Sequence, residues 1–250
     1  MASPFQVNVR STAALVAARF RDNPRQMRFA TALALTRTGQ DVKLAQVAEI
    51  GRVFDRPTPF TLNSVYLKPA TKANLVAVVW LKDFAGKGTP AEKYLAAQIE
   101  GGPRKPKSFE RLLLRSGIMP TGYLAVPGSG AKLDSYGNMS GAQIVQILSA
   151  LKAFGEQGFA ANRSEASKKR KGKKLPMFFV GRPGGGRLPR GVYQRFNFAH
   201  GSAIKPVLIF VRGPRYRPIY RFHDVSTRTV ADVFPGHMER AVAETMATAR

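Results

Sequence analysis

The chain has no cysteine, and this absence excludes several chemistries at once. Disulfide bonds, thiolate metal sites and cysteine nucleophiles all need a sulfur atom that the sequence does not supply. No run of residues approaches the roughly 18 to 20 apolar positions that a membrane-spanning helix needs. The N-terminus also lacks the basic and apolar segments of a secretory signal peptide. We therefore expect a soluble protein that is made in the cytoplasm and does not bind a membrane.

Acidic residues are scarce as well. Fifteen Asp and Glu stand against forty Lys and Arg, which gives a formal net charge of +25. Such an excess stores electrostatic repulsion and predicts a polyanionic or acidic partner, with a basic surface that only serves solubility as the simpler alternative. The hydrophobic content of 44% is ordinary, so the chain is long and apolar enough to bury a core.

Catalytic patterns are few. His200, His223 and His237 lie far apart in the sequence, and packing in the last helix explains His237. The acids stand alone too, among them Asp22, Asp41, Asp55, Asp83 and Asp134. The glycine-rich stretches complete neither a phosphate loop nor a nucleophile elbow, so turn geometry explains them: Gly86–Thr89, Gly128–Gly130 and Gly184–Gly186. We expect no enzyme activity, no metal and no cofactor.

The stretch from Pro24 to Asp83 organises the chain. A long basic helix is expected to end at Pro57 and Pro59, before two strands at Val65–Lys68 and Leu75–Trp80. One helical face combines apolar and polar residues at spacings of three and four: Phe29, Leu33, Thr36, Gln40, Leu44, Val47, Gly51 and Phe54. Because only half of this face is strongly apolar, it suits a docking surface as well as a core.

Further elements follow from periodicity and turn residues. Helices are expected at 12–21, at 91–99 with Thr89 as its N-cap, at 108–115, at 140–161 with Ser140 as its N-cap, and at 225–250. Strands are expected at 5–9, 177–180, 191–198 and 207–212, the last one central in a sheet. Pro235 and Gly236 are expected to kink the last helix or to split it.

Together these elements predict an α+β fold, in which a long N-terminal helix packs on a small mixed or antiparallel sheet. The predicted parts are a helix and hairpin platform at 1–100, an irregular Gly/Pro-rich arm at 101–139, and a helix with a basic loop at 140–175. The strand-rich part with the kinked C-terminal helix, 176–250, is expected to share one core with residues 1–100.

Basic segments are the clearest signal for a partner. Seven of the twelve residues from Arg163 to Lys174 are basic. Further on, Tyr216, Tyr220 and Phe222 alternate with arginines, a pattern that predicts phosphate binding with some stacking on bases. The candidate contacts to DNA or to an acidic partner are Arg163, Lys168, Lys169, Arg170, Lys171, Lys173, Lys174, Arg212, Arg215 and Arg217. A solvated basic loop and an acidic protein partner remain open beside DNA. No DNA-reading motif is present, so any DNA binding is expected to lack sequence specificity.

Two segments resemble a known family. The helix ATALALTRTGQDV at 30–42, followed by RPTPFT at 56–61, resembles phage minor tail proteins of the lambda Z type, also called tail completion or neck proteins. The basic, proline-bearing approach to the final helix is similar too, whereas residues 84–175 match no pattern. The resemblance implies a non-enzymatic virion protein at the head–tail junction or upper tail, which forms a ring around the DNA channel.

The same resemblance implies the partners. They are other copies of the chain, portal, connector or tail proteins, and genomic DNA. The candidate assembly interface is the proline turn of Arg56, Pro57, Thr58, Pro59 and Phe60. A nonspecific DNA-binding phage protein that acts through the Lys/Arg-rich segment is the alternative, and a phage nuclease is disfavoured by the scattered acids.

Overall fold

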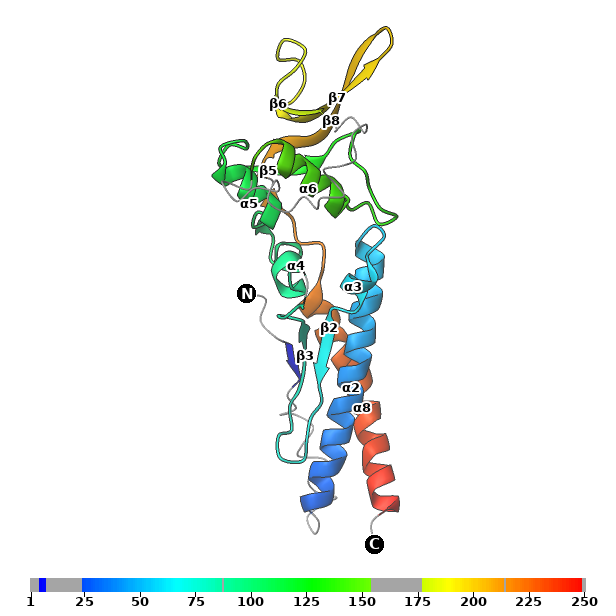
Figure 1. Ribbon diagram of the computed structural model, residues 1–250. Coiled ribbons are helices and arrows are strands. Elements are labelled where there is room, and N and C mark those ends of the chain that lie inside the picture. Colours follow the sequence, from blue (N-terminus) through cyan, green and yellow to red (C-terminus); the bar gives the residue numbers. More distant parts are fainter. Residues whose placement is uncertain (1–4, 8–23, 87, 154–176, 214, 249–250) are drawn as a thin grey trace, which may run out of the picture. The chain divides into compact units, whose positions relative to one another are not determined.

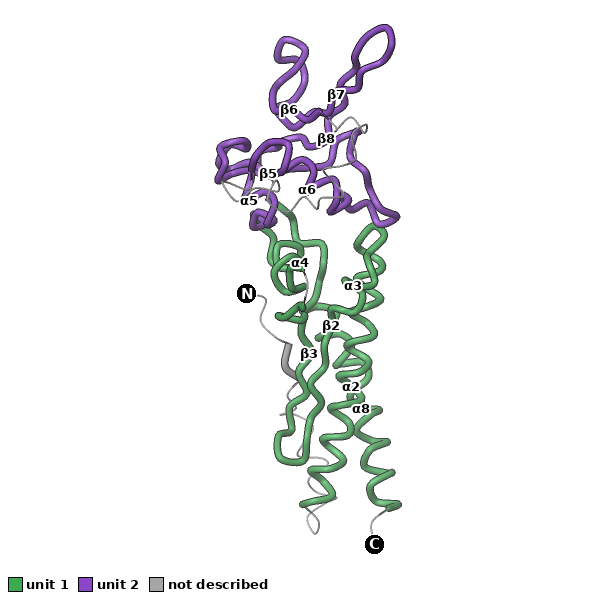
Figure 2. Tube along the Cα trace, viewed as in Figure 1, with its two compact units in different colours: residues 1–102, 216–250 green, residues 103–215 purple. Residues whose placement is uncertain are grey.

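The computed structural model describes residues 5–7, 24–86, 88–153, 177–213 and 215–248 (Figure 1). It divides into two compact units (Figure 2). Unit 1 is Met1–Gly102 with Tyr216–Arg250, and unit 2 is Pro103–Arg215. The two-residue strands β4 (Gly102–Pro103) and β9 (Arg215–Tyr216) stand where the chain leaves unit 1 and returns to it. The predicted α+β class is confirmed, with a long N-terminal helix on a small antiparallel sheet.

Two long helices lie side by side in unit 1, α2 (Pro24–Val53) and α8 (Phe222–Ala247) (Figure 1). Pro24 suits the first helical position, where the N–H that proline lacks has no intrahelical partner. Helix α8 continues through Pro235 and is not split there. Phe234 and Met238, on either side of the proline, are buried against α2, and this packing holds the segment helical.

The face predicted for α2, as a docking surface or a core, is only partly covered: Leu33, Val47 and Phe54 pack against the core of unit 1. Leu44 is 67% exposed and Phe29 is 41% exposed. Gln40 and Gly51 also lie in solvent. The buried positions are mostly small or polar: Ala30, Ala32, Ala34, Leu35, Thr38, Gly39, Val42, Gln46, Glu49 and Ile50. Because α2 packs on both α8 and a sheet, small side chains that permit close approach decide which face is covered.

The sheet of unit 1 has the order β1-β3-β2 and is antiparallel: β1 (Phe5–Val7), β3 (Ala77–Leu81) and β2 (Val65–Lys68). The predicted hairpin is therefore confirmed. The short helix α3 (Pro59–Leu62) precedes β2, and α4 (Ala91–Ile99) follows the sheet at the predicted positions. Thr89 is not the N-cap of α4, because Pro90 occupies that position and no side chain caps the helix.

Polar contacts fix the register of α2 against α8. Arg37 donates two hydrogen bonds of 2.9 Å to the carboxylate of Glu244. Buried Gln46 donates from Nε2 to the Phe222 carbonyl at 2.7 Å and to Ser226 Oγ at 2.8 Å. Since a buried amide without partners is costly, sliding one helix along the other is disfavoured.

Unit 2 is built on a four-stranded antiparallel sheet of order β5-β8-β7-β6. Its strands are β5 (Tyr123–Pro127), β8 (Gly201–Arg212), β7 (Gly191–Phe198) and β6 (Met177–Gly181). Helices α5 (Ser108–Arg115) and α6 (Gly141–Ala150) pack on this sheet around Leu113, Ile147 and Leu208. Strand β8 is central, as predicted for its apolar run.

Three predictions about this region are wrong. The stretch 101–139 is not an irregular arm, because β5 pairs with β8 inside the sheet. Strands β6 to β8 belong to unit 2, so they do not share a core with residues 1–100, whereas α8 does. Helix α6 ends at Ala150, since Leu151 leaves the helix and Lys152 has a φ of 53°. Ser140 stands at its N-cap position without a capping hydrogen bond. The predicted helix at 12–21 lies outside the described residues.

Candidate nucleic-acid and assembly interfaces

Positive charge is concentrated in unit 2. Residues 103–215 hold 21 Lys and Arg against four Asp and Glu, so they carry +17 of the formal +25. The remaining residues hold 19 Lys and Arg against 11 acids, which gives +8. Between Glu165 and Asp224 the sequence contains no carboxylate at all. This uneven division places the electrostatic attraction for an anion mainly in one unit.

The two acids of unit 2 that the structure describes both have internal partners. Asp134 lies in a turn, where its Oδ1 accepts hydrogen bonds from the backbone N–H groups of Tyr136 and Asn138 at 2.9 and 2.8 Å. Glu110 is completely buried, and Arg104 binds its carboxylate with two nitrogens at 2.7 and 2.6 Å. Glu110 is therefore withdrawn from the surface, whereas Asp134 is exposed and keeps its charge there.

The Glu110 carboxylate is charged for a local reason. Its burial raises the pKa, but the hydrogen bonds from Arg104 and from the backbone N–H groups of Lys107 and Ala125 outweigh burial and lower the pKa overall. The Lys107 N–H donates at 2.6 Å and closes a capping box at the start of α5, and the Ala125 N–H donates at 2.8 Å from β5. This one side chain therefore ties the loop before α5, the helix and the sheet together.

Of the ten predicted cationic contacts, three fall within the described residues. Arg212 at the end of β8, Arg215 in β9 and Arg217 after it all have exposed side chains. Arg212 and Arg215 belong to unit 2, whereas Arg217 belongs to unit 1. The other seven, from Arg163 to Lys174, lie outside the described residues.

The predicted stacking by the aromatic residues around these arginines is wrong in two of three cases. Tyr220 is 0% exposed and Phe222 is 2% exposed. Both belong to the core of unit 1, where their rings meet edge to face at 5.8 Å. Burial raises the pKa of Tyr220, which fits a core residue. Their alternation with arginine reflects the entry of the chain into the core of unit 1 at the start of α8, and not a stacking surface for bases.

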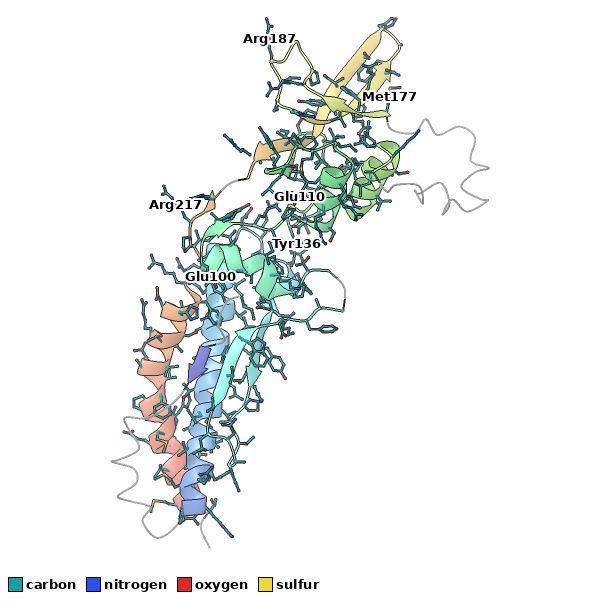
Figure 3. All side chains as sticks on the ribbon, turned by 90° about the vertical axis from the view of Figure 1, so that its left-hand side faces the viewer. Glu100, Glu110, Tyr136, Met177, Arg187 and Arg217 are labelled. Atoms are coloured by element: carbon teal, nitrogen blue, oxygen red, sulfur yellow. The ribbon has the colours of Figure 1, made fainter. Side chains whose placement is uncertain are left out.

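Sequence reasoning missed a second group of cations in unit 2. Arg182, Arg187 and Arg190 are exposed in the loop between β6 and β7, and Arg195 and Lys205 are exposed on the hairpin of β7 and β8. Figure 3 shows Arg187 pointing away from the body of unit 2. The sequence signal that could have indicated this group is the absence of acids between Glu165 and Asp224. The cations of the group are spaced apart, so they do not form a run of basic residues.

The predicted assembly turn, residues 56–60, lies where helix α2 has ended and helix α3 begins. Helix α2 ends at Val53, and Arg56 after it has a φ of 45°, which is not helical. Thr58 then caps α3, since its Oγ1 accepts a hydrogen bond from the Thr61 N–H at 3.2 Å. Pro57 is half-buried, Pro59 is exposed, and Phe60 is 50% exposed with its ring 6.4 Å from that of Tyr94. The motif thus presents an ordered, half-exposed aromatic ring.

A histidine and an aspartate lie together in one place that the sequence did not indicate. His237 Nε2 lies 2.6 Å from Asp41 Oδ2 between α8 and α2, and Arg240 lies 3.0 Å from His237 Nδ1. Packing alone therefore does not explain His237, and Asp41 does not stand alone. Within the described ranges, no group of three or more His, Cys, Asp or Glu is arranged to hold a metal ion. None of the described helices is long and apolar enough to cross a membrane.

Comparison with protein-family models, with curated proteins and with solved structures gave no match to this chain. The fold and its surfaces are therefore interpreted from their own geometry and charge.

Proposed function

We propose that the protein is a non-enzymatic structural subunit of a phage virion, at the head–tail junction or the upper tail. In this role several copies form a ring around the DNA channel and dock on portal, connector or tail proteins. The segments at 30–42 and 56–61 support the proposal by their resemblance to tail completion proteins. Unit 1 supplies the ordered platform on which both segments lie.

The observation that carries the proposal is the formal charge of unit 2. A formal charge of +17 in 113 residues, with both described carboxylates engaged internally, suits a subunit that faces the polyanion passing through a virion channel. An isolated subunit with such a surplus repels its own copies, so a ring of them is more stable when DNA or acidic neighbours supply the opposite charge.

A nonspecific DNA-binding protein that acts outside the virion is the alternative, and the same charge favours it. The two functions differ in where the protein is found. A structural subunit is present in purified particles at a fixed copy number per virion, whereas a free DNA-binding protein is absent from them.

The decisive experiment is a deletion of the coding sequence in the phage, with complementation from a plasmid. We expect electron micrographs to show unjoined heads and tails or unfinished tails, and we expect infectivity to return on complementation. Mass spectrometry of complemented virions then measures the copy number. Normal infectious particles from the deletion mutant would overturn the proposal.

A further inference from the structure

Two projecting segments of unit 2 carry exposed cations. The loop of residues 182–190 and the hairpin of residues 191–205 both extend from the same side of the unit, away from helices α5 and α6 (Figures 1 and 3). Their cations define what we name the loop–hairpin surface: Arg182, Arg187, Arg190, Arg195 and Lys205. None of these residues is explained by the core, since all five side chains are exposed.

The five cations have no acidic partner within the described ranges. The ion pairs that these ranges contain lie elsewhere, as with Arg37 and Glu244 or Arg104 and Glu110. The nearest acids in the sequence are Glu165 and Asp224, more than ten residues away on either side. The surface therefore presents uncompensated charge, which is the state that an anionic ligand stabilises.

Aromatic rings hold two of the cations in defined positions. Arg195 lies 5.6 Å from the ring of Phe179, and Lys205 lies 5.7 Å from the ring of Phe196. Lys205 is paired with Gln194 across the hairpin, so Lys205 and Arg195 lie on opposite faces, because neighbouring residues of a strand alternate. At these positions β7 is also paired with β6, since Met177 lies opposite Arg195, so the sheet carries one ordered cation on each of its two faces.

The loop adds an open backbone. Gly184, Gly185 and Gly186 have φ values of 67°, 65° and 88°, which glycine adopts without strain. A Cβ atom at Gly185 would meet nothing within 4 Å, so the backbone is open there, whereas Leu188 lies beside Gly184 and Arg182 beside Gly186. A phosphate group can therefore approach backbone amides and guanidinium groups together, as in other anion-binding glycine loops.

We propose that the loop–hairpin surface binds the phosphates of duplex DNA without reading its sequence. This inference rests on the proposed function and names the part of the subunit that faces the channel. An acidic protein is the competing partner, but the exposed apolar residues here are few and lie on separate segments: Met177 on β6, Leu188 in the loop and Phe198 at the end of β7. Interfaces between proteins bury a contiguous apolar centre, whereas interfaces with DNA are polar and strongly positive.

The test measures binding of a fluorescent 30-base-pair duplex by the purified full chain at several salt concentrations. The triple variant Arg182→Gln, Arg187→Gln and Arg190→Gln removes three charges from the loop. Its matched control, Arg25→Gln, Lys43→Gln and Lys93→Gln, removes three exposed charges from unit 1. Since each phosphate contact contributes about 0.9 to the slope of log K against log[salt], we expect the loop variant to lower the slope by roughly two to three. The control is expected to leave the slope nearly unchanged.

A third variant keeps the charge. Arg182→Lys, Arg187→Lys and Arg190→Lys is expected to retain most of the slope, and thermal unfolding checks that all variants fold alike. Equal losses in the loop variant and the unit 1 control would overturn the inference, because binding would then follow total charge alone. The loop variant is also tested for complementation of the deletion. If the wild type does not bind the duplex and the loop variant does not complement, the surface binds an acidic protein instead of DNA. That outcome overturns the inference and leaves the virion role standing.

Discussion

The buried carboxylate of Glu110 accepts four hydrogen bonds. Two come from Arg104, and one each comes from the backbone of Lys107 and Ala125. A buried charge is tolerated only where such bonds replace water, and here they also join a loop, a helix start and a strand. In a unit so rich in cations, this carboxylate serves structure and is removed from the surface.

Glu110→Gln tests this role. The amide accepts fewer hydrogen bonds and leaves the partly buried Arg104 guanidinium without its counter-charge, so we expect a loss of about 3 kcal/mol in the free energy of unfolding at pH 7. Urea unfolding followed by circular dichroism measures the loss. Glu100→Gln, at an exposed glutamate, is the control and is expected to change stability by less than about 0.5 kcal/mol.

The contribution of Glu110 to the free energy of unfolding depends on pH. Because the pKa of Glu110 is lowered in the folded state, its contribution is fully present above the unfolded pKa of about 4.3 and is lost as pH falls through the folded value. The gap between wild type and Glu110→Gln should therefore narrow below about pH 4. A gap that stays constant down to the acid transition would contradict a charged Glu110.

Two glycines of helix α2 differ in the space that surrounds them. A Cβ atom at Gly51 would meet nothing within 4 Å, whereas a Cβ atom at Gly39 would lie 2.6 Å from Leu67 Cδ1 on β2. Since alanine favours a helix over glycine, Gly51→Ala should raise the free energy of unfolding by about 0.5 to 1 kcal/mol. Gly39→Ala should lose that gain to overpacking and end about 1 to 3 kcal/mol below Gly51→Ala.

Urea unfolding of both variants measures the difference. The comparison is matched, since the two substitutions are chemically identical and lie on the same helix. Equal stabilisation by both variants would show that α2 does not approach β2 as closely as the contact between Gly39 and Leu67 requires.

The same pair of glycines explains how far the fold was predictable. The long helix, the hairpin, α4 and α5 followed from proline positions and apolar spacing, which are local signals. The buried face of α2 did not, because periodicity favoured the large side chains of Phe29 and Leu44, while close packing selected Ala30, Ala34 and Gly39. Strand β5 was missed since glycines and prolines flank it, and its pairing with β8 is a long-range contact.

The candidate surfaces were predictable only in part. Closely spaced arginines among aromatic residues are visible in a sequence, so Arg212, Arg215 and Arg217 were found, and all three are exposed. The loop–hairpin surface was missed because its cations are spaced apart and only the folded strands bring them to one side. The pairing of Asp41 with His237 joins residues 196 positions apart, which no local pattern indicates.

The two units of the molecule differ in charge. Unit 2 carries +17, whereas unit 1 carries +8 and contains the proline motif with its half-exposed Phe60. Under the proposed function, unit 2 faces the polyanion and unit 1 holds the subunit in its ring. The two tasks are then separable by mutation, which gives a prediction for the assembly motif.

Phe60→Glu places a charge where the motif is expected to meet a neighbouring subunit. Because the ring is 50% exposed and lies 6.4 Å from the ring of Tyr94, we expect the purified variant to unfold within about 1 kcal/mol of wild type and to bind duplex DNA normally. Its incorporation into virions should fall at least tenfold, since exposed aromatic residues at interfaces carry much of the binding energy. Phe84→Glu is the matched control, at a phenylalanine that is 79% exposed and lies outside the motif. Mass spectrometry of complemented particles measures both, and equal incorporation of the two variants would exclude the proline motif as the assembly contact.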